Sequence, residues 1–280
     1  MMKRLNILII IELFYSIFST DINDWRDYPA CKLGRLQSPI EINENESIYA
    51  NNFSFVYQNY KESNFKNVSY DYANVYKFDN GGGYINFERG GVIKQYELKR
   101  FEIYPGIHPI DGKTGDYELH LIHEKNLNFV TNKNQYRSIQ DANMYLVIVL
   151  RYINETNCDG KRCISDGGLL KKIAGKEKVN LNEYSVFQDK RAYFYEGSSL
   201  YIPCDENVNY YVIKDFFTLP GNIGEIKDFK LPDYGNSTIS QSKKYGRPVY
   251  KNFMNYKEVL KSNYISARII ISFLLIFILF

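Results

Sequence analysis

All three histidines of the chain lie in one short stretch, at positions His108, His120 and His123. A neutral imidazole is the most common metal ligand in proteins, and it can also act as a general acid or base near neutral pH. Glu118 stands two residues before His120, a spacing at which a carboxylate can orient a metal-binding imidazole. These residue types therefore indicate metal or acid–base chemistry.

The elements that must position these side chains are two strands. Residues 96–123 form two alternating runs joined by a loop rich in glycine, proline and aspartate, a pattern that predicts neighbouring strands. Period-2 alternation places Glu118 and His120 on one face of the second strand and His123 on the other. On the first strand, Glu102 and Tyr104 share a face. A site on this face is therefore expected to hold one histidine rather than three.

This stretch resembles the zinc-binding core of the α-carbonic anhydrases. That family carries two zinc-binding histidines two residues apart on one strand and a third inside a Glu-Leu-His-Leu-x-His strand. The second motif stands here at Glu118 to His123, so the resemblance makes His120 the retained ligand. The first two ligand positions hold Glu102 and Tyr104.

Further motifs of the same family follow in the same order along most of the chain. They resemble its N-terminal segment, its Asn-Gly turn, its Tyr-Pro-Gly-Ser loop and its C-terminal Arg-Pro signature, and they stand at Trp25 with Tyr28, Gln37 to Ile40, Asp79 to Gly81, Tyr195 to Leu200 with Pro203, and Gly246 to Val249. The resemblance implies a mostly β protein with the α-carbonic-anhydrase fold, a large twisted, mainly antiparallel sheet with short peripheral helices.

The catalytic positions implied by the resemblance are replaced. The family's zinc-hydroxide threonine, the glutamate that it contacts and the proton-shuttle histidine correspond to Tyr201, Ile107 and Gly82. At the ligand position held by Tyr104, a phenol with a reference pKa of about 10 binds zinc poorly at neutral pH because it keeps its proton. We therefore expect no catalytic residue and no cofactor.

Other positions that the resemblance assigns to the site are retained or enlarged. Glu118 would orient His120, while Ile122 and Leu200 would line the pocket. Tyr145 stands where the family has a small valine at the base of the carbon dioxide pocket, and its larger side chain is expected to fill that space.

The resulting interpretation is a carbonic-anhydrase-related protein without enzymatic activity, which presents its surface to an extracellular protein or glycan. The alternative is a zinc-dependent carbonate dehydratase with unusual ligation, in which Glu102, Tyr104 and His120 hold the metal. A third reading is a structural or antigenic coat protein whose fold serves as a stable glycosylated scaffold.

The ends of the chain predict the secretory pathway and the cell surface. Residues 1–19 have a basic start and an apolar run typical of a signal peptide, and an uncleaved apolar anchor is the alternative. Residues 20–255 would form the carbonic-anhydrase-like domain. Residues 256–280 form a polar spacer and an apolar tail, the pattern of a lipid-anchor signal, with a tail anchor as the alternative.

Cysteines and sequons fit the same compartment. The four cysteines suit an oxidising environment, and Cys158 and Cys163 are close enough in sequence to form a local disulfide. The resemblance implies a second disulfide between Cys31 and Cys204. Candidate N-glycosylation sites occur at Asn45, Asn52, Asn67, Asn154 and Asn236.

Composition restricts the class of partner. The net charge of +3 gives no reason to expect nucleic acid. A helix is predicted near Gly168 to Gly175, and four lysines follow its exposed side, at positions Lys171, Lys172, Lys176 and Lys178. They form either a solvated helix face or, with Lys161 and Arg162, a patch for a sulfated polysaccharide.

The apolar run from Met144 to Leu150 predicts a central strand.

Overall fold

The computed structural model describes residues 31, 34–51, 53–68, 74–79, 81–129, 144–154, 163–184, 190–201, 203–219, 246–255 and 258–259. In chain order its strands and helices are β1 (Ile48–Tyr49), β2 (Phe53–Tyr60), β3 (Phe65–Asn67), β4 (Asn74–Phe78), β5 (Gly83–Arg89), β6 (Val92–Pro105), β7 (Tyr117–Lys125), β8 (Tyr145–Ile153), β9 (Cys163–Ile164), the helix α3 (Leu169–Ala174), the 3₁₀ turn η4 (Leu181–Glu183), β10 (Ala192–Gly197), β11 (Val208–Thr218) and β12 (Tyr250–Lys251).

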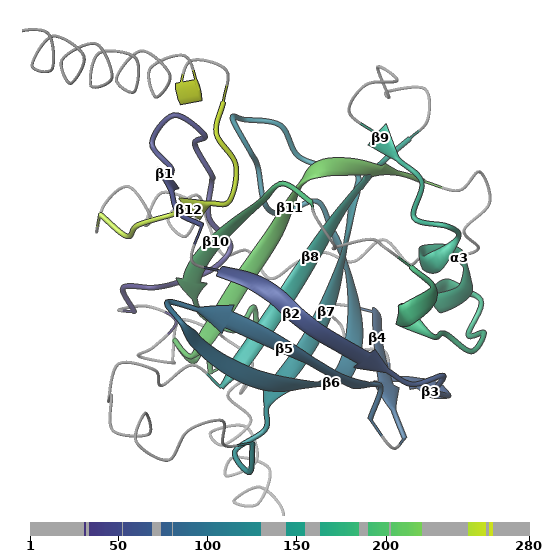
Figure 1. Cartoon of the computed structure of the whole chain (residues 1–280). Coiled ribbons are helices and arrows are strands. Elements are labelled where there is room, and N and C mark those ends of the chain that lie inside the picture. Colours follow the sequence, from purple (N-terminus) through teal and green to yellow (C-terminus); the bar gives the residue numbers. More distant parts are fainter. Residues whose placement is uncertain are drawn as a thin grey trace, which may run out of the picture.

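The strands form one twisted sheet (Figure 1). Its main path has the order β1-β12-β10-β11-β8-β7-β6-β4-β3, while β2 pairs with β5, β5 with β6, and β9 with β11. Most neighbours are antiparallel, but β11 runs parallel to β8 and β9, and β1 runs parallel to β12. The expected mostly β class with a mainly antiparallel sheet is therefore confirmed.

The centre of the sheet is buried on both faces. Strand β8 lies between β7 and β11, and its residues from Leu146 to Tyr152 are all buried. Ile148 belongs to the large apolar cluster on one face, whereas Val147 and Val149 belong to a second cluster on the other. The apolar run thus forms the predicted central strand, because both of its faces have a layer to pack against.

The predicted helix is present as α3. Gly168 precedes it with a left-handed φ of 85°, and Gly175 follows it. Leu169, Leu170 and Ile173 are buried against the sheet. The lysines of the helix and of the following turn lie on its outer side: Lys171, Lys176 and Lys178 are exposed, and Lys172 is half-buried. Lys161 and Arg162 lie outside the described residues.

The N-terminal segment is fastened to the C-terminal signature across the sheet. The Arg247 guanidinium donates to the carbonyl oxygens of Gln37 and Glu196, each at 2.8 Å. The backbone N–H of Ser38 donates to Ser198 Oγ at 3.0 Å. Further along the segment, β1 pairs with β12. Residues 37–49 are thereby held over the sheet.

A disulfide joins Cys31 to Cys204, which are separated by 173 residues, as the resemblance implied. Cys163 is also disulfide-bonded, whereas Cys158 lies outside the described residues. Disulfides of this kind are typical of the secretory pathway.

Three predicted glycosylation sites, Asn45, Asn67 and Asn154, are exposed. Asn52 and Asn236 lie outside the described residues, as do the predicted signal peptide and the apolar tail. Within the described ranges, no helix is long and apolar enough to cross a membrane.

Candidate functional site

The register of β6 and β7 brings the sequence-predicted residues together. Glu102 lies opposite His120, and Tyr104 lies opposite Glu118. All four side chains are buried, and the rings of Tyr104 and His120 are 4.8 Å apart. His123 is on the other face, where its Nε2 lies 2.8 Å from the Tyr60 hydroxyl. The predicted alternation along both strands therefore holds.

A second histidine joins this group from the loop between the two strands. Gly106 lies so close to Gly115 that an added Cβ would stand 1.9 Å from the Gly115 carbonyl oxygen. This close approach folds the loop back, and the backbone N–H groups of Ile107 and His108 donate to Glu118 Oε1 at 2.9 and 2.7 Å. The His108 side chain is fully buried.

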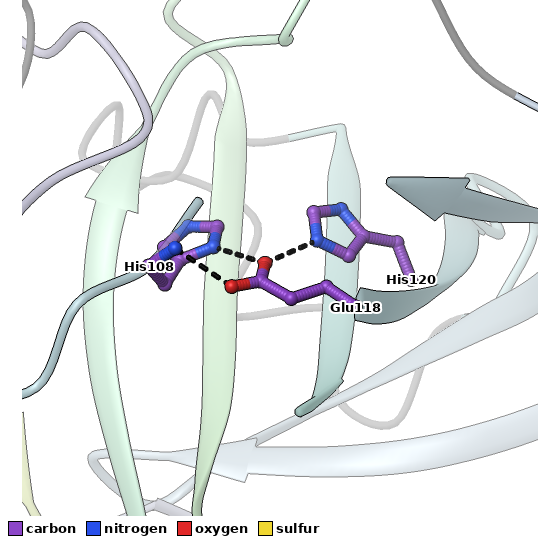
Figure 2. Close-up of side chains that lie close together, drawn as sticks. All are labelled: His108, Glu118 and His120. Atoms are coloured by element: carbon purple, nitrogen blue, oxygen red, sulfur yellow. Dashed lines mark hydrogen bonds and ion pairs between the residues drawn. The ribbon is translucent and has the colours of Figure 1, made fainter. Parts of the chain in front are cut away.

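Glu118 is the centre of a buried hydrogen-bond group with His108 and His120 (Figure 2). Its Oε2 lies 2.7 Å from His108 Nδ1 and 3.0 Å from His120 Nε2. On its far side, His108 Nε2 lies 2.7 Å from the Tyr195 hydroxyl. The carboxylate of Glu118 thus faces four nitrogen donors.

The protonation states follow from these contacts. Burial alone would raise the pKa of Glu118, but His108 and the other donors lower it well below its usual range, so the group is ionised. Burial lowers the pKa of His108, although Glu118 opposes this shift. A neutral His108 then donates a hydrogen bond from Nδ1 to Glu118, and its Nε2 accepts a hydrogen bond from the Tyr195 hydroxyl.

One ring nitrogen of His120, Nδ1, has no hydrogen-bond partner among the described residues. If its Nε2 donates to Glu118, its Nδ1 carries a lone pair, and this buried atom has no hydrogen-bond partner among the residues that the structure describes. Figure 2 shows the ring nitrogen farther from Glu118 pointing away from the carboxylate. A buried acceptor without a partner is rare in proteins, so a water molecule or a metal ion is the expected partner of this atom.

The two replaced ligand positions are engaged in a separate group, which we call the Arg100 network: Arg100, Glu102, Tyr104 and Tyr201. Arg100 Nε donates to Glu102 Oε1 at 2.6 Å, and the Tyr104 hydroxyl donates to Glu102 Oε2 at 2.8 Å. Arg100 Nη2 donates to the Tyr201 hydroxyl at 2.5 Å. Burial alone would lower the pKa of Arg100, but Glu102 raises it above its ordinary value, so a cation is held at this position.

These residues do not fit a three-ligand zinc centre as they are arranged. Tetrahedral zinc with bonds of about 2.0–2.2 Å requires its ligand atoms to be about 3.3 Å apart or more. The nitrogens of His108 and His120 are closer than this to Glu118, at hydrogen-bond distance. Both oxygens of Glu102 are engaged, and the Arg100 cation beside it would repel a metal ion. Of these ligand atoms, only His120 Nδ1 has a lone pair that no described residue engages and that could bind a metal ion.

The remaining predicted positions surround the Arg100 network. Ile122, Tyr145 and Leu200 line a cavity of about 20 Å³ together with Glu102 and His120. This volume is about that of one water molecule. The structure therefore brings the predicted pocket residues together around a very small space.

Two replaced catalytic positions have become packing positions. The Ile107 side chain belongs to a small apolar cluster with Tyr104 and Leu200. Gly82 is buried against β6, where an added Cβ would lie 2.6 Å from Leu98 Cδ2. A histidine at position 82 would therefore force Leu98 to move.

Sequence reasoning named His108 but did not place it in the site, where one histidine was expected and two contact Glu118, and it did not consider Arg100. His108 is in a loop, where alternation does not predict contacts, and no pattern placed it against Glu118. Arg100 was open to prediction, because it precedes Glu102 by two residues and therefore shares its face of β6.

Comparisons with known proteins agree with this architecture. A sequence model of the eukaryotic-type carbonic anhydrase family matches residues 20–251. Alpha carbonic anhydrase 8 of Arabidopsis thaliana is 28% identical over 202 residues, which are 69% of this chain and 46% of that protein. Dioscorin DB3S of Dioscorea polystachya is 23% identical over 203 residues, 69% of this chain and 67% of that protein. The chain thus spans about half the length of the Arabidopsis relative.

A solved structure extends the likeness to three dimensions. The crystal structure of dioscorin complexed with ascorbate superposes with a TM-score of 0.54 and 17% sequence identity, covering 82% of this chain and 90% of that chain. At this identity the likeness shows a shared fold, and it says nothing of shared ligands.

Proposed function

The chain belongs to the eukaryotic-type, or α-, carbonic anhydrase family, and from this premise we propose that it is a member without enzymatic activity, an extracellular binding or recognition protein. One observation carries the proposal. Arg100 and Tyr104 engage both oxygens of Glu102, the residue that stands where the family has its first zinc ligand. Carbon dioxide hydration in the family depends on a metal-bound water, and this arrangement disfavours the metal.

The surroundings of the Arg100 network support the same proposal. The Tyr201 hydroxyl, at the position of the family's zinc-hydroxide threonine, accepts a hydrogen bond from Arg100 and so belongs to the network that holds this cation beside Glu102. The adjoining cavity, of about 20 Å³, is small for a site that must hold carbon dioxide beside a water molecule. The Glu118 group is compatible with a structural role, because it joins the loop of His108 to β7 and, through Tyr195, to β10.

The experiment compares metal content and activity in four proteins. The full chain and the triple variant Arg100→Gln/Glu102→His/Tyr104→His are purified from a secretory host, and zinc is measured by mass spectrometry. We expect the native chain to bind less than stoichiometric zinc and to show no sulfonamide-sensitive hydration of carbon dioxide. The triple variant should bind zinc, because it adds two imidazoles next to His120 Nδ1 and removes the cation.

Two controls separate site geometry from histidine content. The variant Tyr84→His/Glu88→His adds two histidines to β5, away from His120, and should not gain zinc. The double variant Glu102→His/Tyr104→His, which leaves Arg100 without its carboxylate, should bind zinc more weakly than the triple variant. Stoichiometric zinc with measurable turnover in the native chain would refute the proposed function.

The second candidate function is a zinc-dependent carbonic anhydrase with unusual ligation. It is favoured by family membership and by the Nδ1 of the buried His120, which has no hydrogen-bond partner among the described residues. In this case Glu102 would exchange Arg100 for the metal, and Tyr104 would supply the third ligand atom. Zinc, when bound in this way, would supply the acidified water of the family reaction.

The proposed location and partners extend the main proposal. The Cys31–Cys204 disulfide supports passage through the secretory pathway, and the apolar tail would hold the protein at the cell surface. The partner would be an extracellular protein or glycan. The exposed lysines near α3 make a sulfated polysaccharide the first glycan to test.

A further inference from the structure

A second cavity, of about 340 Å³, lies where β8 and β11 meet the N-terminal segment. It shares no lining residue with the small cavity beside His120. Its charged lining consists of four cations and three carboxylates, a net charge of +1: Lys113, Arg151, Arg191 and Lys214, with Glu44, Asp111 and Asp215. We call it the Arg151 cavity.

Arg151 is a buried cation without a counter-ion in this cavity. Its exposed fraction is 1%, and it forms no ion pair with any described residue. Its two terminal nitrogens donate to the carbonyl oxygens of Lys214, at 3.2 Å, and Lys113. Its Nε has no partner within the described part of the chain. Burial lowers the pKa of Arg151 to about 10, although the more distant carboxylates of Glu118 and Asp215 oppose this shift.

The carboxylates near Arg151 are mostly engaged by other cations. Glu44 pairs with Lys214 and also accepts from the Tyr193 hydroxyl at 2.9 Å. Asp215 pairs with Arg191 through both of its oxygens. Two cations therefore keep their charge for a ligand, the buried Arg151 and the exposed Lys113.

A bulge in β11 fixes Arg151 in this position. Val212 pairs with Val149 and Phe216 with Arg151, so β11 has two more residues than β8 between the two pairs. The extra residues turn the Lys214 carbonyl toward Arg151, and the guanidinium lies 4.2 Å from the centre of the Phe216 ring. Bulges of this kind re-aim side chains beside functional sites. The cation is held by dipoles and an aromatic face, which leaves its charge available.

We propose that the Arg151 cavity binds the oxyanion group of a small organic molecule, with Arg151 Nε as the buried donor and Lys113 at the rim. The ligand class is a carboxylate or sulfate ester of about monosaccharide size, because the cavity is larger than a bare inorganic anion requires and falls at the small end of organic-ligand sites. Asp111 at the rim offers an acceptor for a ligand hydroxyl, and Ile110 offers an apolar wall. The inference goes beyond the proposed function and holds whether or not zinc binds near His120.

The test measures binding of defined probes to the full chain. Sodium glucuronate and sodium sulfate are compared with glucose by calorimetry and by thermal unfolding, at low chloride and equal ionic strength. We expect glucuronate, sulfate or both to bind and to raise the unfolding temperature, and glucose to do neither. The two anions distinguish a carboxylate-type from a sulfate-type ligand, and either one supports the site.

Three substitutions locate the binding. Arg151→Gln should weaken binding at least about tenfold, because a hydrogen bond to a charged group is lost. Lys113→Gln changes only an exposed side chain and should weaken binding severalfold without affecting folding. Lys61→Gln removes an exposed lysine from another part of the surface and should change nothing.

Asn45 also lines the cavity and belongs to a sequon, so a glycan could cover the mouth. The experiment is therefore repeated with Asn45→Gln, in which binding should persist or increase. The proposal is overturned if neither anion binds to either protein, if glucose binds equally well, or if Lys113→Gln and Arg151→Gln leave the affinity unchanged. If Arg151→Gln does not fold, the anion affinity of Lys113→Gln alone tests the location of the site.

Discussion

His123 should make the protein less stable in mild acid. Burial lowers the pKa of His123 from 6.5 to about 4, because desolvation disfavours the charged form of its fully buried ring, and the carbonyls of Leu121 and Leu146 oppose this only in part. Between these values the unfolded chain binds a proton at His123 that the folded chain does not bind. Acidification through this range therefore favours unfolding, and the stability contributed by neutral His123 is present above pH 6.5 and lost as the pH falls toward about 4.

The size of the effect follows from the two pKa values. At pH 7 His123 is neutral in the folded state and mostly neutral in the unfolded state, whereas at pH 5 it stays mostly neutral only in the folded state. The free energy of unfolding should accordingly be lower at pH 5 than at pH 7 by about 2 kcal/mol from His123 alone. The pKa of His108 is also lowered and adds a loss of the same sign. Glu118 contributes little in this range, because its lowered pKa matters only below the ordinary pKa of a glutamate.

Urea unfolding followed by circular dichroism at pH 7 and pH 5 measures this difference. His123→Gln removes the titrating group, so its pH dependence should be smaller than that of the native chain by about 2 kcal/mol. Tyr60→Phe is the matched control: it removes the hydroxyl next to His123 Nε2 and lowers stability, yet it keeps the titration and the pH dependence. Equal pH dependence in the native chain and in His123→Gln would refute the reasoning.

Three further predictions concern the Glu118 group, the disulfides and the lysines. Glu118→Ala should lower the free energy of unfolding, measured in urea, by about 3–5 kcal/mol, because it leaves buried donors unpaired. Tyr195→Phe removes one hydrogen bond and should lower it by about 1 kcal/mol. Equal losses in the two variants would contradict the central place of Glu118. Cys31→Ser should reduce secretion far more than Cys158→Ser, because the Cys31–Cys204 disulfide closes a long loop, for which the chain-entropy model gives about 4–5 kcal/mol. Peptide mapping that found Cys31 paired with Cys158 would contradict this assignment. Immobilised heparan or chondroitin sulfate should retain the chain at low salt, with retention lost at high salt and in Lys171→Glu/Lys172→Glu; retention unaffected by the double substitution would exclude the lysines as the contact.

The sequence predicted the parts of the fold and of the site that depend on regular strands. Alternation alone separated His123 from Glu118 and His120, and the apolar run after Met144 predicted the doubly buried β8. These predictions succeeded because a strand has a fixed period, so each residue's face follows from its neighbours.

The parts that escaped prediction depend on contacts between distant segments. His108 reaches Glu118 because Gly106 and Gly115 approach each other in a loop, and no periodic signal records such an approach. Arg151 follows the apolar run of β8 directly, but nothing in that run predicts an isolated cation, because the bulge that isolates Arg151 lies on β11. Whether Glu102 was open to a metal ion depended on its ion pair with Arg100, a residue to which the family resemblance assigned no role.

The pairing of the first strand with the last has a consequence for biosynthesis. Among the described strands, β1 pairs with β12 only, and Lys251 Nζ also donates to the Glu44 carbonyl at 2.9 Å. The β1–β12 pairing beside Asn45 therefore cannot form until about 200 further residues have been made, which takes about 10–40 s at ordinary rates of translation. If the sequon at Asn45 is used as predicted, Asn45 would still lie beside an unpaired β1 while the glycosylation machinery of the endoplasmic reticulum acts on it. A ribosome that slows near the end of the message would lengthen the interval and raise the fraction of chains that carry a glycan there.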